Sequence, residues 1–340
     1  MRRTRRRIVR VVRILVVTQM WPSPERPELG AFVERQVRAL ERLGADVAVA
    51  SVAPGPGGWR APLKWIRLFS AARDAARTSR PDVVVGHFLF PGGWAARRAA
   101  RIAQAPYAVV AHGRDVANAE TSVWLRRRTR RVLSGAGLVV AVSQPLADRL
   151  AAVCSLPPDV LIAHMGVDRT TFRPGDRDIA ASALGPEPRR PLVVQIGVKN
   201  GAALAEAVAG IDGELWLAGS GPAVAGARML GLVPPAEVSR VLRAADVAAF
   251  VPEREGYGLG ALEAMACGLP VVVSRTIPVT ADLPPSCAVI VDPREPAAIG
   301  AALRAAIALP RDDPGGQAAA DANSVDAMAA RLLHALDRLR

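Results

Sequence analysis

Residues 253–274, with the sequence EREGYGLGALEAMACGLPVVVS, combine two acidic side chains with a glycine-rich turn. The turn runs from Glu255 to Gly260, and Glu263 falls in the short helical pattern that follows. Glycines lack a Cβ and let a ligand approach the backbone closely. The unpaired N–H groups at the start of a helix favour an anion. This stretch therefore predicts an anion site that is bordered by two carboxylates.

Two carboxylates beside an anion site indicate a ligand that also presents hydroxyl groups. A carboxylate accepts a hydrogen bond from a hydroxyl, and each such bond is worth about 1.5–3 kcal/mol. An anion with hydroxyls on both sides describes a nucleotide sugar, with its ribose, diphosphate and sugar. The sequence thus predicts a nucleoside-diphosphate sugar as the ligand of the segment from Glu255 to Glu263.

The basic residues single out one further position. The chain has 44 lysines and arginines, of which only Lys64 and Lys199 are lysine. Lys199 stands in QIGVKNGAAL (195–204), a glycine-flanked turn between an apolar run and a helical pattern. A compact ammonium group in such a turn suggests a point-charge ligand for phosphate. A chance placement is the alternative.

The elements that position these residues follow from short apolar runs, separated by Ala/Leu/Arg stretches of helical period. Continuous apolar strands that alternate with helices are typical of parallel sheets covered on both faces. The predicted strands are residues 13–18, 46–52, 82–87, 107–112, 138–143, 160–164, 191–197, 214–219, 246–251, 270–274 and 288–292. Eleven strands are many for one sheet, so we expect two doubly wound α/β domains.

The stretch 173–190 is rich in Pro, Gly and charge and lacks a sustained period, so it is the predicted linker. We expect an N-terminal, acceptor-side Rossmann-like domain at 1–172, which includes a basic tail at 1–12. A C-terminal, nucleotide-sugar-binding Rossmann-like domain follows at 191–322. An amphipathic helix at 323–340 is expected to pack back on the first domain. Ligands of such sheets bind beyond the carboxyl ends of the strands, so two facing domains form a cleft.

At this point the chain resembles a known family, the retaining glycosyltransferases with the GT-B fold and in particular glycosyltransferase family 4 (group 1). Glu255 and Glu263 form its E-x7-E signature. Other matching pieces occur in family order over nearly the whole chain: LGAFVERQVRALERLGADVAVAS (29–51), HGRDV (112–116), VAVSQPLADRL (140–150), GVDRTTFRP (166–174), LWLAGSGP (215–222) and ADVAAFVP (245–252). FVERQVRAL and HFLFPGGWAA (87–96) look most like the teichuronic-acid and cell-surface glycan branch.

The resemblance implies a role for each matching residue. Glu255 contacts the hydroxyls of the transferred sugar, Glu263 binds the ribose and Lys199 binds the diphosphate. The implied catalytic residues are His112, Glu255 and Lys199. The implied donor-binding residues are Gly30, Gly197, Lys199, Leu232, Glu255, Tyr257, Gly258, Leu259 and Glu263. No metal ligand and no cofactor besides the substrate are implied.

The resemblance further implies transfer with retention of configuration and without a metal, from the nucleotide sugar to a glycan or lipid-linked acceptor of the cell envelope. One departure lies after the strand at 191–197. The family has Gly-Arg, a short loop and Lys-Gly, whereas here Gly197 is followed by Val198 and at once by Lys199. The phosphate-binding arginine is missing. A non-catalytic subunit with a degraded donor site therefore stays open as an alternative, and an epimerase or phosphorylase of the same fold ranks last.

The net charge of +13 predicts attraction to anionic partners. Seven arginines fall in residues 2–13, and five more lie in Arg126–Arg131. Solvated surfaces, an anionic membrane and nucleic acid are the candidate explanations. No aromatic residue interleaves with either cluster, so we expect no stacking platform beside the charge and no nucleic-acid partner. The membrane stays a candidate partner, because each arginine near an anionic surface contributes about 1 kcal/mol.

The cysteines and the hydropathy indicate the compartment. Cys154, Cys267 and Cys287 show no CxxC spacing, which suits free thiols in a reducing cytoplasm. No stretch approaches 18 uninterrupted apolar residues, so we expect no membrane span. The expected location is the cytoplasm, with peripheral attachment to the inner face of the plasma membrane.

Overall fold

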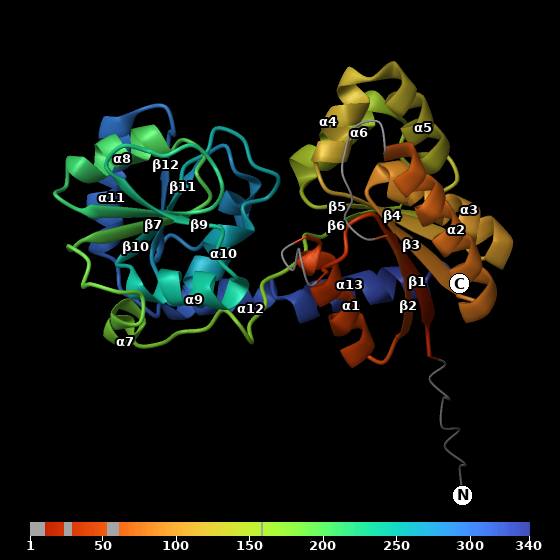
Figure 1. The fold of residues 1–340 in the computed structure, drawn as a ribbon, viewed down its shortest axis with the longest axis horizontal. Helices are drawn as coiled ribbons and strands as arrows, with labels where there is room; N and C mark the ends of the chain where they lie inside the picture. The colour runs from red at the N-terminus through yellow and green to blue at the C-terminus, as the bar shows by residue number, and fades with distance from the viewer. Residues whose placement is uncertain (1–10, 24–28, 53–60, 158) are drawn as a thin grey trace, which may run out of the picture. The chain divides into compact units, whose positions relative to one another are not determined.

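The chain forms two compact units, each built on its own parallel sheet (Figure 1). The computed structural model describes residues 11–23, 29–52, 61–157 and 159–340. Unit 1 consists of residues 1–165 and 329–340, and unit 2 consists of residues 166–328. Most of the predicted basic tail, residues 1–10, lies outside the described residues. Arg13, the last arginine of the N-terminal cluster, is described and pairs with Asp82 at 2.9 Å.

Unit 1 contains a six-stranded sheet in the order β2-β1-β3-β4-β5-β6, with every pairing parallel. Its strands are β1 (Arg13–Thr18), β2 (Asp46–Ser51), β3 (Val83–His87), β4 (Tyr107–Ala111), β5 (Leu138–Ala141) and β6 (Val160–Ile162). All residues of β3, β4 and β5 are buried, which explains why these strands show continuous apolar runs in place of alternation. The six strands predicted for this half are all present.

Helices flank the sheet of unit 1 (Figure 1). They are α1 (Ala31–Arg42), α2 (Ala61–Ser79), η2 (Leu89–Gly93), α3 (Trp94–Ala103), α4 (Arg114–Thr121), α5 (Val123–Leu133) and α6 (Gln144–Val153). The last helix, α13 (Val325–Asp337), starts in unit 2, and its residues from Ala329 onward group with unit 1. Met328, Leu332 and Leu336 are buried, as the apolar stripe of this segment predicts.

Unit 2 contains a second six-stranded parallel sheet, in the order β12-β11-β10-β7-β8-β9. Its strands are β7 (Leu192–Ile196), β8 (Glu214–Ala218), β9 (Ala227–Gly231), β10 (Val247–Phe250), β11 (Val271–Ser274) and β12 (Ala288–Val291). Five of these strands were predicted, and β9 was not. As an edge strand, β9 is half-exposed and carries Arg228, so it has no apolar run to reveal it.

The helices of unit 2 are α7 (Arg177–Ser182), α8 (Gly201–Ala209), α9 (Pro235–Ala244), α10 (Leu259–Ala266), η3 (Pro278–Asp282), α11 (Pro296–Ile307) and α12 (Pro314–Ala322). Helix α7 lies inside the segment predicted as a linker, and the Asp176 carboxylate caps it by accepting the Ile179 N–H at 2.8 Å. Val167 and Phe172 are buried in the core of unit 2. Their burial places the start of unit 2 at residue 166, before the predicted linker.

The chain enters and leaves unit 2 through two neighbouring segments. The Val167 N–H donates to the Asn323 carbonyl, and the Val325 N–H donates to the Val167 carbonyl, both at 2.9 Å. Gly166 has φ +79°, and a Cβ there would lie 2.5 Å from the Val325 Cα. A glycine is therefore needed for the two segments to approach so closely.

Candidate functional site

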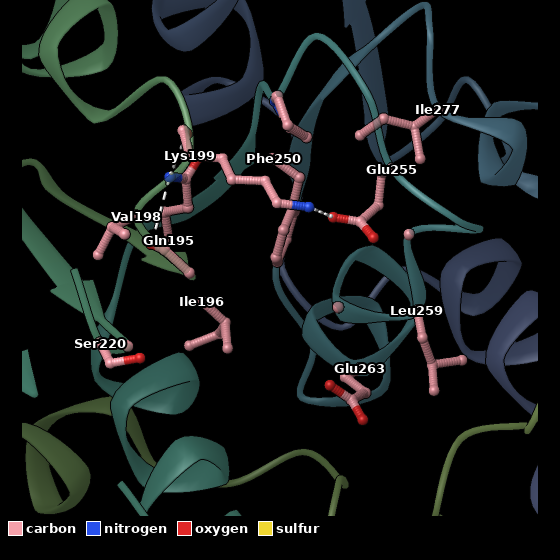
Figure 2. Close-up of a pocket in the computed structure, with 15 residues that line it drawn as sticks. Gln195, Ile196, Val198, Lys199, Ser220, Phe250, Glu255, Leu259, Glu263 and Ile277 are labelled. Atoms are coloured by element: carbon pink, nitrogen blue, oxygen red, sulfur yellow. Dashed lines mark hydrogen bonds and ion pairs between the residues drawn. The ribbon is translucent and has the colours of Figure 1, made fainter. Parts of the chain in front are cut away.

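A pocket of about 450 Å³ opens in unit 2 at the carboxyl ends of β7, β8, β10 and β11 (Figure 2). Its walls are the segments that follow these strands and the first turns of α10. The lining residues are 195–199, 219 and 220, Phe250, Pro252, Glu255, 258–260, Glu263 and Ile277. This edge of a parallel α/β sheet is where ligands bind as a rule. The glycine-rich turn and the lysine turn, which are far apart in the sequence, thus meet in one pocket.

Helix α10 begins at the pocket because Gly258 allows the chain to turn there. Gly258 has φ +96° and immediately precedes α10. A Cβ at this position would lie 2.4 Å from Cγ2 of Ile277, so a larger residue does not fit. Gly258, Leu259 and Gly260 all line the pocket, which brings the positive end of the helix to it. The arrangement favours an anionic ligand.

Lys199 and Glu255 face each other across the pocket (Figure 2). The Lys199 Nζ lies 2.9 Å from the Glu255 Oε2, and the side chains are 62% and 37% exposed. The other carboxylate oxygen of Glu255 accepts the Gly256 N–H at 2.9 Å. An exposed ion pair of this kind contributes only about 0–1 kcal/mol. An anionic ligand can therefore replace the carboxylate beside the ammonium group at little cost.

Glu263 lies farther along α10, apart from the Lys199–Glu255 pair (Figure 2). It is half-buried and lines the same pocket. The two glutamates thus border different parts of one cavity, with the helix start at Gly258 between them in the sequence. A ligand with hydroxyl groups at both ends and an anion in the middle matches this order of groups.

The shortened turn that carries Lys199 is held by Gln195, a buried side chain near the end of β7. Its Nε2 donates to the Lys199 carbonyl at 3.0 Å and to the Gly197 carbonyl at 3.3 Å. Its Oε1 accepts the Val251 N–H at 3.4 Å. Because both ends of the amide are used, Gln195 fixes the lysine turn to the end of β10. The sequence analysis missed Gln195, since a single polar residue in an apolar run carries no pattern.

Asn200 holds the other side of the same turn. It has φ +56°, a left-handed conformation that asparagine tolerates better than most residues, and it precedes α8. Its Nδ2 donates to the Val251 carbonyl at 2.9 Å and to the Pro293 carbonyl at 2.7 Å. The sequence analysis missed this residue too. An asparagine just before a helical pattern is the signal that could have found it.

Two of the donor-binding residues predicted in unit 2 do not line this pocket. The Tyr257 hydroxyl donates to Oδ2 of Asp282 at 2.5 Å, and its ring packs against the core of unit 2. Leu232 follows β9 and is 69% exposed. The predicted residues that do meet in the pocket are Gly197, Lys199, Glu255, Gly258, Leu259 and Glu263.

The two remaining predicted residues, Gly30 and His112, belong to unit 1. Gly30 precedes α1 with φ +83°, and a Cβ there would lie 2.4 Å from the carbonyl oxygen of Met20. The close approach of the Met20 backbone is therefore sufficient reason for a glycine at this position, and no ligand is needed to account for it. His112 follows β4, and its ring stands among those of His87, Phe88 and Phe32, with centroid distances of 5.3, 4.4 and 5.2 Å.

The two histidines of unit 1 contact each other directly. Nδ1 of His87 lies 3.1 Å from Nε2 of His112. His87 is fully buried, and burial lowers its pKa to about 3. Burial, and then the neighbouring His87, lower the pKa of His112 well below its ordinary value. Both rings are therefore neutral at pH 7, so His112 brings no positive charge to a substrate.

Asp115, which the sequence analysis did not single out, supports the turn that presents His112. Its buried carboxylate accepts four backbone N–H groups at 2.9–3.1 Å, those of Leu89, His112, Gly113 and Val116. Burial raises the pKa of the Asp115 carboxyl, and these four donors oppose the rise. The carboxylate thus ties the end of β4 and the start of α4 to η2.

The arginine cluster of α5 is only partly a solvated surface. Arg126 donates to the Ala119 and Glu120 carbonyls at 3.2 and 2.6 Å, and so closes the end of α4. The Arg128 guanidinium lies 4.7 Å from the Trp94 ring and 4.8 Å from the Trp124 ring. The expectation that no aromatic platform stands beside this charge is therefore wrong. Trp124 precedes the cluster on the same helix, whereas Trp94 is distant in the sequence and is brought beside it by the fold.

Comparison with known proteins gives two family matches. The sequence profile of Glycosyltransferase Family 4 matches residues 2–171. The profile described as Glycosyl transferases group 1 matches residues 195–308, which contain the whole pocket. The first match covers the acceptor-side half of the expected arrangement and the second the nucleotide-sugar half.

Two relatives illustrate the range of similar sequences. TuaC of Bacillus subtilis (strain 168), named as a candidate teichuronic acid biosynthesis glycosyltransferase, is 25% identical over 77% of this chain and 80% of its own length. The D-inositol 3-phosphate glycosyltransferase of Mycobacterium sp. (strain KMS) is 29% identical over 68% of this chain. The match spans 62% of the length of that relative.

Solved structures resemble nearly the entire chain. Sucrose-phosphate synthase from Thermosynechococcus elongatus has a TM-score of 0.74 at 17% identity, covering 97% of this chain and 99% of its own. Anabaena Alr3699/HepE, solved with UDP and glucose, has a TM-score of 0.73 at 16% identity, and the match covers 96% of this chain and 100% of that one. These likenesses confirm the predicted fold class, which is GT-B.

Proposed function

Because the chain belongs to Glycosyltransferase Family 4, we propose that it is a retaining glycosyltransferase that uses a nucleoside-diphosphate sugar. The observation that carries the proposal is the pocket of unit 2. There the ammonium group of Lys199, the start of α10 and the carboxylates of Glu255 and Glu263 surround one cavity. When the diphosphate lies at the helix start, the hydroxyl groups on its two sides can each donate to one of the two carboxylates.

We assign each group the role that its chemistry allows. The helix start and Lys199 stabilise the negative charge that develops on the departing nucleoside diphosphate. Glu255 binds hydroxyls of the transferred sugar, Glu263 binds the ribose, and His112 contributes a contact with the transferred sugar. The leaving phosphate oxygen accepts the proton of the acceptor hydroxyl on the same face of the sugar. These fixed positive groups do the work that a metal ion does elsewhere, so we propose a metal-independent transfer.

We propose a glycan or lipid-linked acceptor in the synthesis of cell-envelope polysaccharide or glycolipid. The support is the similarity to TuaC, whose name refers to teichuronic acid biosynthesis. The name of the mycobacterial relative refers instead to D-inositol 3-phosphate, so the two relatives point to different substrates. HepE was solved with UDP-glucose, which makes UDP the first nucleotide to test.

The test of this function is nucleotide binding by calorimetry, with UDP, GDP and ADP. We expect one of them to bind, and we expect Lys199→Ala and Glu263→Ala each to weaken it about tenfold or more, since each removes a charge-assisted hydrogen bond. Lys64→Ala, which removes the only other lysine and lies in unit 1, is the matched control and should leave binding unchanged. No binding by a folded sample at millimolar nucleotide would favour the non-catalytic subunit.

We further propose that unit 1 attaches peripherally to an anionic membrane surface. Residues 61–73, 89–103 and 123–133 contain eleven lysines and arginines and no aspartate or glutamate. The rings of Trp65, Phe90 and Trp124 join the three segments, with centroids 5.1 Å apart for Trp65–Phe90 and for Phe90–Trp124. The exposed large apolar side chains on these segments are Leu63, Ile66, Ile102, Val123 and Trp124.

This combination favours a lipid surface over a nucleic acid. Exposed aliphatic side chains can enter the acyl boundary, while the neighbouring cations meet anionic headgroups. The aromatic rings pack on one another and on Arg128, which reduces the faces left for stacking bases. No helix among the described residues is long and apolar enough to cross a membrane, so attachment would be to the surface.

Vesicle sedimentation tests the attachment. We expect binding to phosphatidylcholine vesicles only when they contain phosphatidylglycerol, and weaker binding as salt rises. Ile66→Asp combined with Val123→Asp should abolish it. Ile179→Asp is the matched control, because Ile179 is 72% exposed but lies in unit 2. Binding that ignores lipid charge, or that is retained by the double variant, would contradict the proposal, as would tighter binding to single-stranded nucleic acid.

A further inference from the structure

His87 and His112 share one hydrogen bond at the carboxyl ends of neighbouring strands. His87 ends β3 and pairs with Val110 of β4, two residues before His112. The rings are nearly parallel, at 20°, and the 3.1 Å contact joins Nδ1 of His87 to Nε2 of His112. Because this register belongs to the sheet, the two nitrogens are held together by the fold itself.

A single proton lies between these two nitrogens, since both rings are neutral, and it can be arranged in two ways. In the first arrangement, His87 Nδ1 carries the proton and donates it to His112 Nε2. His112 then carries its own proton on Nδ1. In the second arrangement, His112 Nε2 carries the proton and donates it to His87 Nδ1. His112 Nδ1 is then a bare lone pair, and His87 carries its proton on Nε2.

The surroundings of His87 distinguish the two arrangements. Its Nε2 is buried and has no hydrogen-bond partner among the described residues. In the first arrangement this atom is only a lone pair, whereas in the second it is an N–H without an acceptor. A buried donor without a partner is the rarer case in proteins, as it is among backbone groups. The first arrangement is therefore the more stable one.

We propose that His87 is a positioning residue that holds His112 in the tautomer with its proton on Nδ1. His112 then offers a fixed hydrogen-bond donor to an oxygen atom of the ligand. That this donor meets the transferred sugar rests on the function proposed above. His112 cannot serve as a general base in this state, because Nε2 already accepts from His87. Its ring also packs against the rings of Phe88 and Phe32, which opposes a flip that would exchange the two nitrogens.

Nitrogen-15 spectroscopy of histidine-labelled full chain tests the tautomer without any substrate. Long-range proton–nitrogen correlations separate a protonated ring nitrogen from a bare one. We expect Nδ1 of His112 and Nδ1 of His87 to be protonated and both Nε2 atoms to be bare at pH 7. A protonated Nε2 on His112, or a doubly protonated ring, would overturn the proposal. This readout holds even if the proposed transfer reaction is wrong.

Steady-state kinetics with two substitutions of His87 test the positioning role. Asparagine can place an amide N–H where Nδ1 lies, whereas leucine cannot. We expect His87→Leu to lower kcat about tenfold, the value of roughly one hydrogen bond, with KM for the donor sugar nearly unchanged. His87→Asn should restore most of kcat. Equal losses in both variants would mean a merely structural role and would contradict the proposal. His334→Asn, on the exposed side of α13, is the control and should match the native chain.

Discussion

The Gly258→Ala variant is expected to lose about 3 kcal/mol of stability in unit 2 and at least about a hundredfold in affinity for the sugar nucleotide. Two costs add at this position. A non-glycine residue in the left-handed region costs about 1–2 kcal/mol, and a core overfilled by a methyl group costs about 1–3 kcal/mol. The second cost arises because the Cβ would lie 2.4 Å from Cγ2 of Ile277 and 2.9 Å from Cγ1 of Val279. The backbone at the start of α10 must shift to relieve that overlap, and the proposed anion site depends on the position of this helix start.

Two other glycines separate these effects. Gly231 has φ +70° and open space around its missing Cβ, so Gly231→Ala should show the backbone cost alone, about 1 kcal/mol, with normal nucleotide affinity. Gly197 has φ +106°, similarly open space, and a place in the pocket wall. Gly197→Ala should therefore lose affinity while showing only the same backbone cost, about 1 kcal/mol. Hydrogen exchange in rising urea, measured on peptides of unit 2, gives the stabilities. A Gly258→Ala variant as stable as Gly231→Ala would refute the packing argument.

The Asp115→Ala variant is expected to destabilise unit 1 by about 4 kcal/mol. The substitution leaves four backbone N–H groups without the acceptor that they now share. A buried donor that loses its partner costs about 1–3 kcal/mol, and local relaxation recovers part of the total. Two of these donors are the N–H groups of His112 and Gly113, so the backbone that carries the His112 ring loses its support. The variant should therefore also lose the defined His87–His112 contact.

Urea unfolding followed by tryptophan fluorescence measures this loss. Five of the six tryptophans lie in unit 1, so the signal reports mainly on that unit. Asp148→Ala is the matched control, since Asp148 is exposed on α6 and its carboxylate accepts the side-chain amide of Gln144, which is also exposed. That variant should stay within about 0.5 kcal/mol of the native chain. A similar small change for Asp115→Ala would show that water or a neighbouring group replaces the carboxylate.

The sequence was sufficient for most of the fold because parallel strands that are buried on both faces are continuous apolar runs. Strand β9 escaped prediction for the converse reason. It lies at the edge of its sheet, it is partly exposed, and Arg228 interrupts it. Helix α7 escaped because its six residues are too few to establish a helical period. Both elements are specified by their neighbours and not by a pattern of their own.

The candidate site was likewise predicted only in part. Glu255, Gly258 and Glu263 lie within nine residues of one another, so their spacing could be interpreted. Gln195 and Asp115 act by hydrogen bonds to backbone groups that no spacing identifies. Sequence patterns thus predict the groups that line the pocket, whereas the groups that hold these in place emerge only from the folded chain.

The two neighbouring segments at Val167 and Val325 have a consequence for how this chain can be divided. Unit 2 is an insertion into unit 1, and its two ends meet through backbone hydrogen bonds. A domain whose ends meet can be excised, or its ends joined, with little change to its interior. Residues 166–328 thus form a piece that recombination could exchange as a whole, carrying its pocket intact. The same topology makes residues 329–340 part of the fold of unit 1, so that unit gains these residues only after the whole of unit 2 has been synthesised.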